Sequence, residues 1–158
     1  MPRRLAGDMR AYRIGDPQGR FPIWSPDGAI RVAGRWHEAG AEVIYASENY
    51  STALLEILAH WNGLLPRGQK YIEITIPRGT SYEMVMEDAI PNWFERSAEA
   101  ARRFGRDWYA EDRSAILIVP SVVARMEQNV VINSRHAEFT NFMVGPEKPV
   151  FWDERLLP

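Results

Sequence analysis

Arg35 stands beside Trp36 in the segment RVAGRWHEAGAEVIYAS, residues 31–47, where a loop rich in Gly and Ala leads into a short apolar stretch. A guanidinium group donates two parallel hydrogen bonds, so it suits a phosphate or a carboxylate. Arginine also occurs in such places as a solvated loop residue, or as a structural side chain that rests on an aromatic ring. The segment by itself leaves these three roles open.

Glu56 is the second candidate for chemistry. On a helical wheel it lies opposite an apolar stripe, which is the usual place for a solvated glutamate. Its neighbours at three and four positions are small or uncharged, however, so no Lys or Arg is available to pair with it. We expect this pattern in the wall of a cleft. The stripe consists of Leu54, Ile57, Leu58 and Trp61, and the neighbours are Thr52, Ala53, Ala59 and His60.

The other candidates lie where expected strands begin or end. Tyr45 either presents its ring and hydroxyl to a pocket or packs in the core. Ser121 follows a strand. Because the sequence shows no Ser/His/Asp arrangement around it, we expect Ser121 to form a hydrogen bond to a ligand rather than to act as a nucleophile. The alternative is a structural role in a turn or cap. Asn133 and His136 are secondary candidates, although a single histidine is more often structural. Arg13 is either a second arginine facing phosphate or half of a cross-strand salt bridge.

The elements that must position these residues are short and mixed. Alternation of apolar and polar residues predicts strands, and apolar residues at helical spacing predict helices. Such a mixture indicates an α/β or α+β domain. The expected strands are 11–15, 42–47, 70–77, 115–120, 129–134 and 148–153. One helix is expected to start at an N-cap, Ser51, and to stop at Gly63, and a second is expected over about 93–110. Residues 16–40 are expected to form one long loop.

Composition excludes several classes of protein. The 158 residues suit one domain, residues 1–158, and the net charge of −2 provides no basic surface for nucleic acid. Cysteine is absent, the three histidines lack HExxH spacing, and neither GxGxxG nor GxxxxGK[ST] occurs, so we expect no metal site and no P-loop or Rossmann site. No segment resembles a signal peptide or a membrane span. A cytoplasmic protein is the expectation.

The whole pattern resembles the RES-domain family of bacterial toxins, which is named for characteristic Arg, Glu and Ser residues. Three blocks carry the resemblance: AGRWHEAGAEVIYASENYSTALLEILAHW, GRDWYAEDRSAILIVPSVVARMEQNVVINSRHAEF and FWDERLL. Together they extend from about residue 11 to residue 156. The chain departs from the family where GRWHEAG replaces GRWN followed by prolines, and where INSRHAEF replaces a form richer in proline.

The resemblance implies a compact fold similar to that of ADP-ribosyltransferases, a mixed split β-sheet with flanking helices. It also implies NAD⁺ as substrate, no cofactor, and a hetero-oligomer in which an Xre-type antitoxin covers the pocket. Carried over residue by residue, Arg35 would bind the phosphates from a flexible loop, Tyr45 would contact nicotinamide, and Glu56 would bond a ribose hydroxyl. Ser121 would add a hydrogen bond to the ligand.

Three functions compete at this point. The first is a toxin that cleaves the nicotinamide-ribose bond of NAD⁺, with water or phosphate as acceptor. The second transfers ADP-ribose to a protein. The third is a non-catalytic binding module or a ribonuclease, and the lack of a basic surface and of a His/Lys catalytic pair speaks against the ribonuclease.

Overall fold

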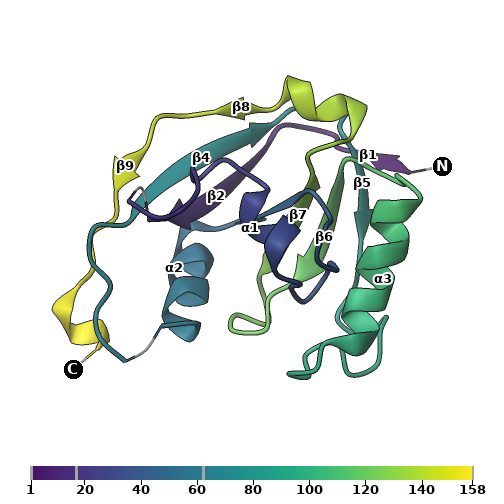
Figure 1. Cartoon of the computed structure of the whole chain (residues 1–158). Coiled ribbons are helices and arrows are strands. Elements are labelled where there is room, and N and C mark those ends of the chain that lie inside the picture. The colour runs from purple at the N-terminus through teal and green to yellow at the C-terminus, as the bar shows by residue number, and fades with distance from the viewer. Residues whose placement is uncertain (1, 17, 62, 158) are drawn as a thin grey trace.

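A computed structural model describes residues 2–16, 18–61 and 63–157 of the chain (Figure 1). Strands are more numerous than helices, and the longer helices α2 and α3 lie on opposite sides of the molecule beneath a curled sheet. In chain order the elements are β1 Arg3–Arg4, β2 Met9–Gly15, α1 Asp27–Arg31, β3 Val43–Ser47, α2 Tyr50–Ala59, β4 Lys70–Ile76, β5 Ser81–Met84, α3 Glu99–Ala110, β6 Ile116–Pro120, β7 Gln128–Asn133, η1 Ala137–Asn141, β8 Met143–Val144, β9 Lys148–Pro149 and η2 Glu154–Leu156.

The sheet is mixed and nearly divided in two. Its strand order is β1-β5-β6-β7-β3-β2-β4-β8, with β9 also on β4; β5 and β6 are parallel and the other pairs antiparallel. β3 pairs with β7 along its whole length, but it meets β2 only at Tyr12 and Ser47. The strands therefore diverge at the centre of the sheet, which confirms the expected split α+β architecture.

The core covers both faces of the larger half of the sheet, and one of its two apolar clusters also extends onto β2 and β4. Successive side chains of a strand point to opposite faces. Ile116 and Ile118 of β6 accordingly join one apolar cluster, whereas Leu117 and Val119 join the other. Every residue of β6 is buried. The continuous apolar run AILIVP is thus a strand covered on both sides, as predicted.

α3 covers one of these faces with an amphipathic surface. Its buried residues Ala101, Gly105 and Trp108 recur at helical spacing. Trp108 is fully buried, and its indole N–H donates to the hydroxyl of Ser114 (2.8 Å). The helix expected over 93–110 therefore exists, although it begins only at Glu99.

α2 packs against β2 and β3, where the sheet divides. It starts after Asn49 rather than at Ser51, and it ends before Gly63. The apolar stripe expected from the sequence is only partly covered. Thr52 and Ala53 are the buried residues of the helix, while Leu54, Ile57 and Leu58 are half-buried and Trp61 is 39% exposed. Only two diverging strands support the helix, so one narrow side of it is covered.

The remaining differences concern very short elements. α1 interrupts the loop expected over 16–40, β5 follows β4, and two-residue strands β1 and β8 extend the edges. The last expected strand, 148–153, is reduced to β9. Segments of two to five residues are too short to display a hydrophobic period. No helix in the described residues has the length and apolarity to cross a bilayer.

Candidate active site

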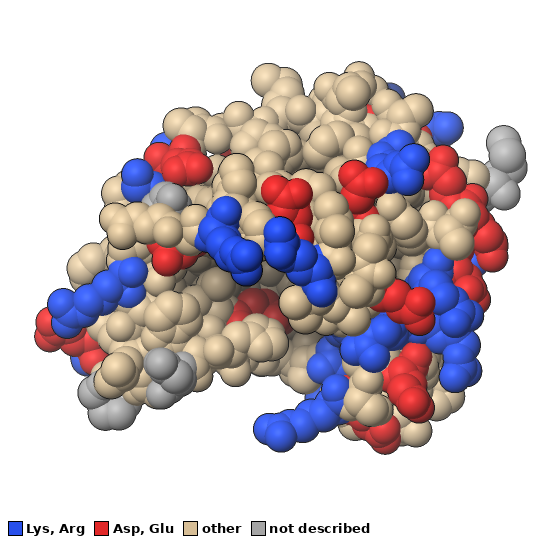
Figure 2. Space-filling model, in the orientation of Figure 1, with Lys and Arg blue, Asp and Glu red and all other residues tan. Residues whose placement is uncertain are grey.

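A cavity of about 790 Å³ opens where β2 and β3 diverge. This volume is typical of sites for small ligands, which measure roughly 300–1,000 Å³. Figure 2 shows the face as hollowed, with basic side chains around the hollow and acidic atoms in its depth. The polar and charged side chains of its lining include Arg35, Tyr45, Ser47, Glu56, Arg102 and Asn129.

Arg35 lies on a tight, anchored turn. The backbone N–H of Gly34 donates to the carbonyl of His37 (3.1 Å), and a Cβ atom at Gly34 would lie 2.9 Å from the hydroxyl of Tyr45. Trp36 is 2% exposed and stacks against Trp93. These contacts hold the turn in place. The sequence led us to expect a flexible loop here, and the structure corrects this expectation to an anchored turn. Gly34 permits close packing rather than movement.

The guanidinium group of Arg35 is held through one of its nitrogens. Nη1 donates to the carbonyls of Trp93 (2.8 Å) and Glu95 (2.7 Å). Burial lowers the pKa of Arg35, and the nearby carboxylate of Glu56 opposes that shift. Both acceptors are neutral, so the positive charge of Arg35 stays available to a ligand. Arg35 is thus anchored to the fold through Nη1, while Nη2, which has no hydrogen-bond partner among the described residues, is left to bind an anion.

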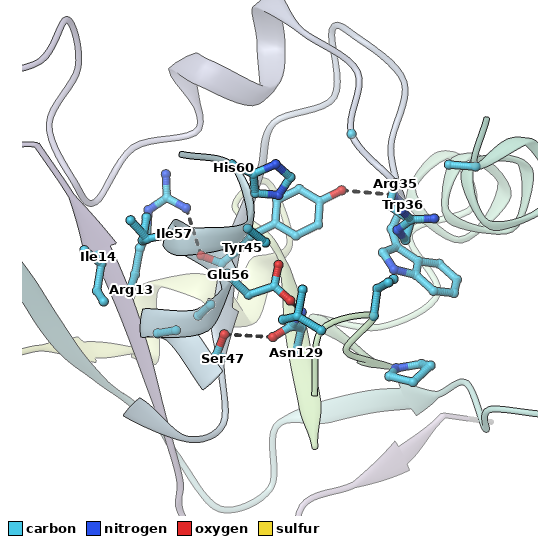
Figure 3. A pocket seen from close by; sticks show the side chains of 18 of the residues that line it. Arg13, Ile14, Arg35, Trp36, Tyr45, Ser47, Glu56, Ile57, His60 and Asn129 are labelled. Carbon is cyan, nitrogen blue, oxygen red and sulfur yellow. Dashed lines mark hydrogen bonds between the residues drawn. The ribbon is translucent and has the colours of Figure 1, made fainter. Parts of the chain in front are cut away.

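Tyr45 presents its ring to the cavity while its hydroxyl is occupied elsewhere. That hydroxyl accepts from the backbone N–H of Trp36 (3.1 Å; Figure 3), and it lies 2.7 Å from Nδ1 of His37. Nε2 of His37 faces the carbonyls of Ala29 (3.0 Å) and Val32 (2.9 Å), which only accept hydrogen bonds. Nε2 therefore carries the hydrogen, and Tyr45 donates to Nδ1. Burial raises the pKa of Tyr45, which keeps the hydroxyl protonated.

Glu56 is held through one carboxylate oxygen. Its Oε1 accepts from the hydroxyl of Ser121 (2.9 Å) and from the side-chain amide of Asn129 (3.1 Å). The amide oxygen of Asn129 in turn accepts from the hydroxyl of Ser47 (2.7 Å), and Figure 3 shows Glu56 directed toward Asn129. Oε2 has no hydrogen-bond partner among the described residues. The arrangement fixes one oxygen and leaves the other for a ligand, and it confirms that Glu56 lies in a cleft wall.

Ser121 acts on the site through Glu56. It is fully buried, and its one hydroxyl hydrogen goes to Glu56. The same oxygen accepts from the backbone N–H of Ala124 (3.1 Å), which closes the turn after β6. It does not appear among the described residues that line the cavity. These contacts favour a role for Ser121 in positioning Glu56 over the direct bond to a ligand that the sequence led us to expect.

Arg13 lines the cavity, but its donors serve the fold. Nε donates to the carbonyl of Ile23 (2.6 Å) and Nη1 to the carbonyl of Tyr45 (2.8 Å), so the side chain bridges the division between β2 and β3. Burial lowers the pKa of Arg13 to about 10. The cross-strand contact exists, yet it joins a guanidinium to carbonyls and is not a salt bridge. The phosphate-facing role stays a prediction, because Arg13 lines the cavity and its Nη2 has no hydrogen-bond partner among the described residues.

Asn133 and His136 do not belong to the cavity. Asn133 ends β7 opposite Val43, and its side chain donates to Asp112 (3.1 Å). His136 caps η1, its Nδ1 accepting from the backbone N–H of Glu138 (3.1 Å). Four residues of extended strand separate Asn133 from Asn129 by about 13 Å. The structure does not bring these two candidates to the described cavity lining, because the opposite end of β7 reaches Glu56.

Sequence reasoning also missed several residues of the site. Asn129, Ser47, His37 and Arg102 carry no motif of their own, and the polar residue that opens NVVINS was the one available signal for Asn129. The described lining contains four arginines, namely Arg13, Arg35, Arg96 and Arg102, and Glu56 is its one carboxylate. Among the described residues, no three His, Cys, Asp or Glu side chains gather to hold a metal ion. The cavity thus suits an anionic organic ligand.

A family model described as the RES domain matches residues 10–153. The chain belongs to the RES-domain family. The RES domain described here is 31% identical to a Prs ADP-ribosylating toxin of Sphingobium sp. (strain YBL2), over 98% of this chain and 94% of the relative. It is 29% identical to Toxin Res of Yersinia enterocolitica over 94% and 99% of the two chains. It is 32% identical to Toxin Res of Pseudomonas putida (strain KT2440), over 72% of this chain and 79% of the relative.

The fold of this RES domain also occurs in a solved structure, the M. tuberculosis MbcT-MbcA toxin-antitoxin complex. The TM-score is 0.68, and the match covers 93% of this chain and 86% of the other. At 11% sequence identity the likeness concerns the fold alone. Together with the sequence relatives it confirms the resemblance to RES-domain toxins.

Proposed function

We propose that this RES-domain toxin breaks the bond between nicotinamide and ribose in NAD⁺, with water or phosphate as the acceptor of the ADP-ribosyl group. Growth would then stop as NAD⁺ is depleted. The observation that carries the proposal is the carboxylate of Glu56, which Ser121 and Asn129 hold in a cavity whose other charged groups are arginines. The arginines suit the negative charges of a diphosphate, and the carboxylate suits a hydroxyl of the ribose.

The arrangement suits a reaction in which bond breaking runs ahead of bond making. Nicotinamide leaves as a neutral group, and positive charge develops on the ribose as in glycoside cleavage. The free Oε2 of Glu56 would accept a hydrogen bond from a ribose hydroxyl and stabilise that charge. Arg35 would hold the phosphates while the ring of Tyr45 packs on the reacting end. Catalysis would rest on positioning and charge, without a cofactor.

Transfer of ADP-ribose to a protein is the second candidate function. One observation favours it: the chain is 31% identical, over nearly its whole length, to a protein named a Prs ADP-ribosylating toxin. Both reactions break the same bond and make the same demands on Arg35, Tyr45 and Glu56. They differ only in the acceptor.

One experiment separates the candidates. The purified protein, freed of any antitoxin, is incubated with NAD⁺ labelled in its adenine, with and without phosphate and with and without cell protein. Free ADP-ribose or its 1″-phosphate would support the first function, and label on a protein band would support the second. A Glu56→Gln variant controls for contaminating activity. NAD⁺ that stays intact under all conditions would leave a non-catalytic binding module and overturn both.

An antitoxin partner belongs to the same proposal. The solved structure with this fold is a toxin-antitoxin complex, and the sequence relatives are named as toxins. A protein that consumes NAD⁺ must be inhibited in the cell that makes it. We propose a small antitoxin of the Xre type that covers the cavity.

A further inference from the structure

We propose that Arg102 and Arg35 form a two-part clamp for the diphosphate of the substrate, with one guanidinium group for each phosphate. Arg102 lies in the first turns of α3, is partly buried and lines the cavity. The inference rests on the proposed function, because it names the part of the ligand that this side of the cavity recognises.

The two arginines are joined through one turn. Nε of Arg102 donates to the carbonyl of Gly34 (3.0 Å), and Gly34 directly precedes Arg35. Burial lowers the pKa of Arg35 most, the carboxylate of Glu56 opposes that shift, and the positive charge of Arg102 adds to it. The two like charges are therefore close to each other. Such an arrangement costs free energy unless an anion lies between or beside them.

The protein offsets this charge only in part, through the carboxylate of Glu56 in the same cavity. Elsewhere on the described surface arginines meet carboxylates, as Arg106 meets Asp107 (3.0 Å) and Arg113 meets Glu83 (2.9 Å). Within the described part of the chain, neither Arg35 nor Arg102 forms a salt bridge. Their hydrogen bonds go to neutral carbonyls, and Glu56 is the one carboxylate of the described lining. One carboxylate faces the several arginines of the described lining, so an anionic ligand would supply the remaining negative charge.

Each guanidinium group is also fixed along one side. Arg102 uses Nε and Nη1, the second in a 3.4 Å bond to the carbonyl of Ser97, while Arg35 uses Nη1. Nη2 of both residues has no hydrogen-bond partner among the described residues. A planar group held in this way loses little further entropy when it binds phosphate oxygens. Two such groups match the two negative charges of a diphosphate.

A substitution can separate phosphate binding from support of the turn. In Arg102→Gln the amide nitrogen is as many bonds from Cα as Nε is in arginine, so it can still donate to the carbonyl of Gly34. The charge and the Nη groups are lost. Arg103→Gln is the matched control, because Arg103 is the next residue of α3, is exposed, and is not among the described residues of the cavity lining.

The test measures the affinity of the full chain for ADP-ribose by titration calorimetry at several salt concentrations. Hydrogen bonds to charged groups are stronger than those between neutral groups, so we expect Arg102→Gln to bind ADP-ribose about ten-fold more weakly or worse. Its affinity should also depend less on salt, because one ionic contact is missing. Arg103→Gln should bind as the unmodified chain does.

Two results would overturn the clamp: ADP-ribose affinity and salt dependence unchanged in Arg102→Gln, or an equal loss in Arg103→Gln. If Arg102→Gln fails to fold, Arg102→Lys replaces it. That variant keeps the charge but not the fork, so unchanged affinity there would also contradict the proposal. Failure of the proposed function looks different, because the unmodified chain would then neither bind ADP-ribose nor consume NAD⁺.

Discussion

Glu56 owes its proposed role to its neighbours in space. Ser121 and Asn129 both bond Oε1, so the carboxylate cannot turn away from the cavity without losing two hydrogen bonds. A group held in advance does not have to reorient while charge develops in the transition state. Arg35 is held in a similar way by two carbonyls. At the scale of single residues, the site is preorganised.

Glu56→Gln and Arg35→Ala should each abolish toxicity and lower NAD⁺ consumption by about 10²-fold or more, the loss typical of removing one preorganised electrostatic group. Both side chains are only partly buried, so the fold should survive with little loss of stability. Growth assays, NAD⁺ quantification and thermal melts of the purified variants check this. Variants that stay folded and consume NAD⁺ at the normal rate would refute the site assignment.

The buried pair of His37 and Tyr45 should make stability depend on pH. Burial lowers the pKa of His37 from 6.5 in the folded state. Below pH 6.5 the unfolded chain then binds more protons at this residue than the folded chain does. The contribution of His37 to the free energy of unfolding is therefore fully present above that pH and is lost as the pH drops toward the folded pKa. His37→Gln removes this proton-linked loss.

Urea unfolding at about pH 7.5 and about pH 5.5, on either side of the ordinary histidine pKa, measures the effect. The difference in unfolding free energy between the two conditions should be smaller in His37→Gln than in the unmodified chain. His60→Gln is the control, because His60 is exposed. An undiminished pH effect in His37→Gln would show that His37 is not responsible.

At the scale of elements, the division between β2 and β3 creates the site. A continuous sheet would fill this place with a ladder of backbone hydrogen bonds, whereas here Arg13 bridges the strands with its side chain. α2 brings Glu56 to the division, and β3 brings Tyr45. α3 supports the turn of Arg35 from the other side, where Gly105 lies against the backbone of Trp36.

Gly105→Ala should therefore damage both stability and the site. An added Cβ would lie 1.7 Å from the carbonyl oxygen of Trp36, so α3 or the turn must move. We expect a loss of about 3 kcal/mol in the free energy of unfolding, at the upper end of ordinary overpacking. Binding of ADP-ribose should weaken as well, since the turn carries Arg35.

Gly28→Ala is the matched control for this substitution. Gly28 lies in α1, and a Cβ there meets no atom within 4 Å. Alanine favours helices over glycine by up to about 1 kcal/mol, so stability should stay the same or rise. Denaturant unfolding of both variants supplies the comparison. A Gly105→Ala protein as stable as Gly28→Ala would contradict the close contact between α3 and the turn.

At the scale of the whole molecule, positive charge gathers at the cavity of an acidic protein. The net charge is −2, yet the described cavity lining contains four arginines and one glutamate. Phe94 (43% exposed) and Val123 (40%) add apolar surface to the lining. This combination favours a small anionic ligand and a protein partner with an acidic, partly apolar segment, and it gives no support to a ribonuclease.

The antitoxin and NAD⁺ should compete for the cavity. We expect the C-terminal segment of the antitoxin to enter the cleft between Arg35, Tyr45 and Glu56, with a carboxylate bonded to Arg35, since a carboxylate offers the same geometry as a phosphate. Its affinity for the inactive Glu56→Gln variant, measured over a series of NAD⁺ concentrations, tests this. Affinity that does not weaken as NAD⁺ approaches saturation would place the antitoxin elsewhere.

The sequence by itself determined the family and much of the local structure. Alternation in KYIEITI and the apolar run AILIVP each follow from how a strand is buried, so β4 and β6 could be predicted. Arg35, Tyr45 and Glu56 could be named because the resemblance preserves their order and spacing, and all three line one cavity. Local hydrophobic pattern and the spacing of family motifs are both properties of the linear sequence, so they can be read without the fold.

Only the tertiary structure decided which other residues belong to the site. Both Asn129 and Asn133 flank the same apolar run, and the pairing of β7 with β3 brings the first to Glu56 and the second to Asp112. The hydrogen bonds of Glu56 join residues 65 and 73 positions apart in the chain. Contacts of that range depend on strand register and on where α2 crosses the division of the sheet, which no local periodicity encodes.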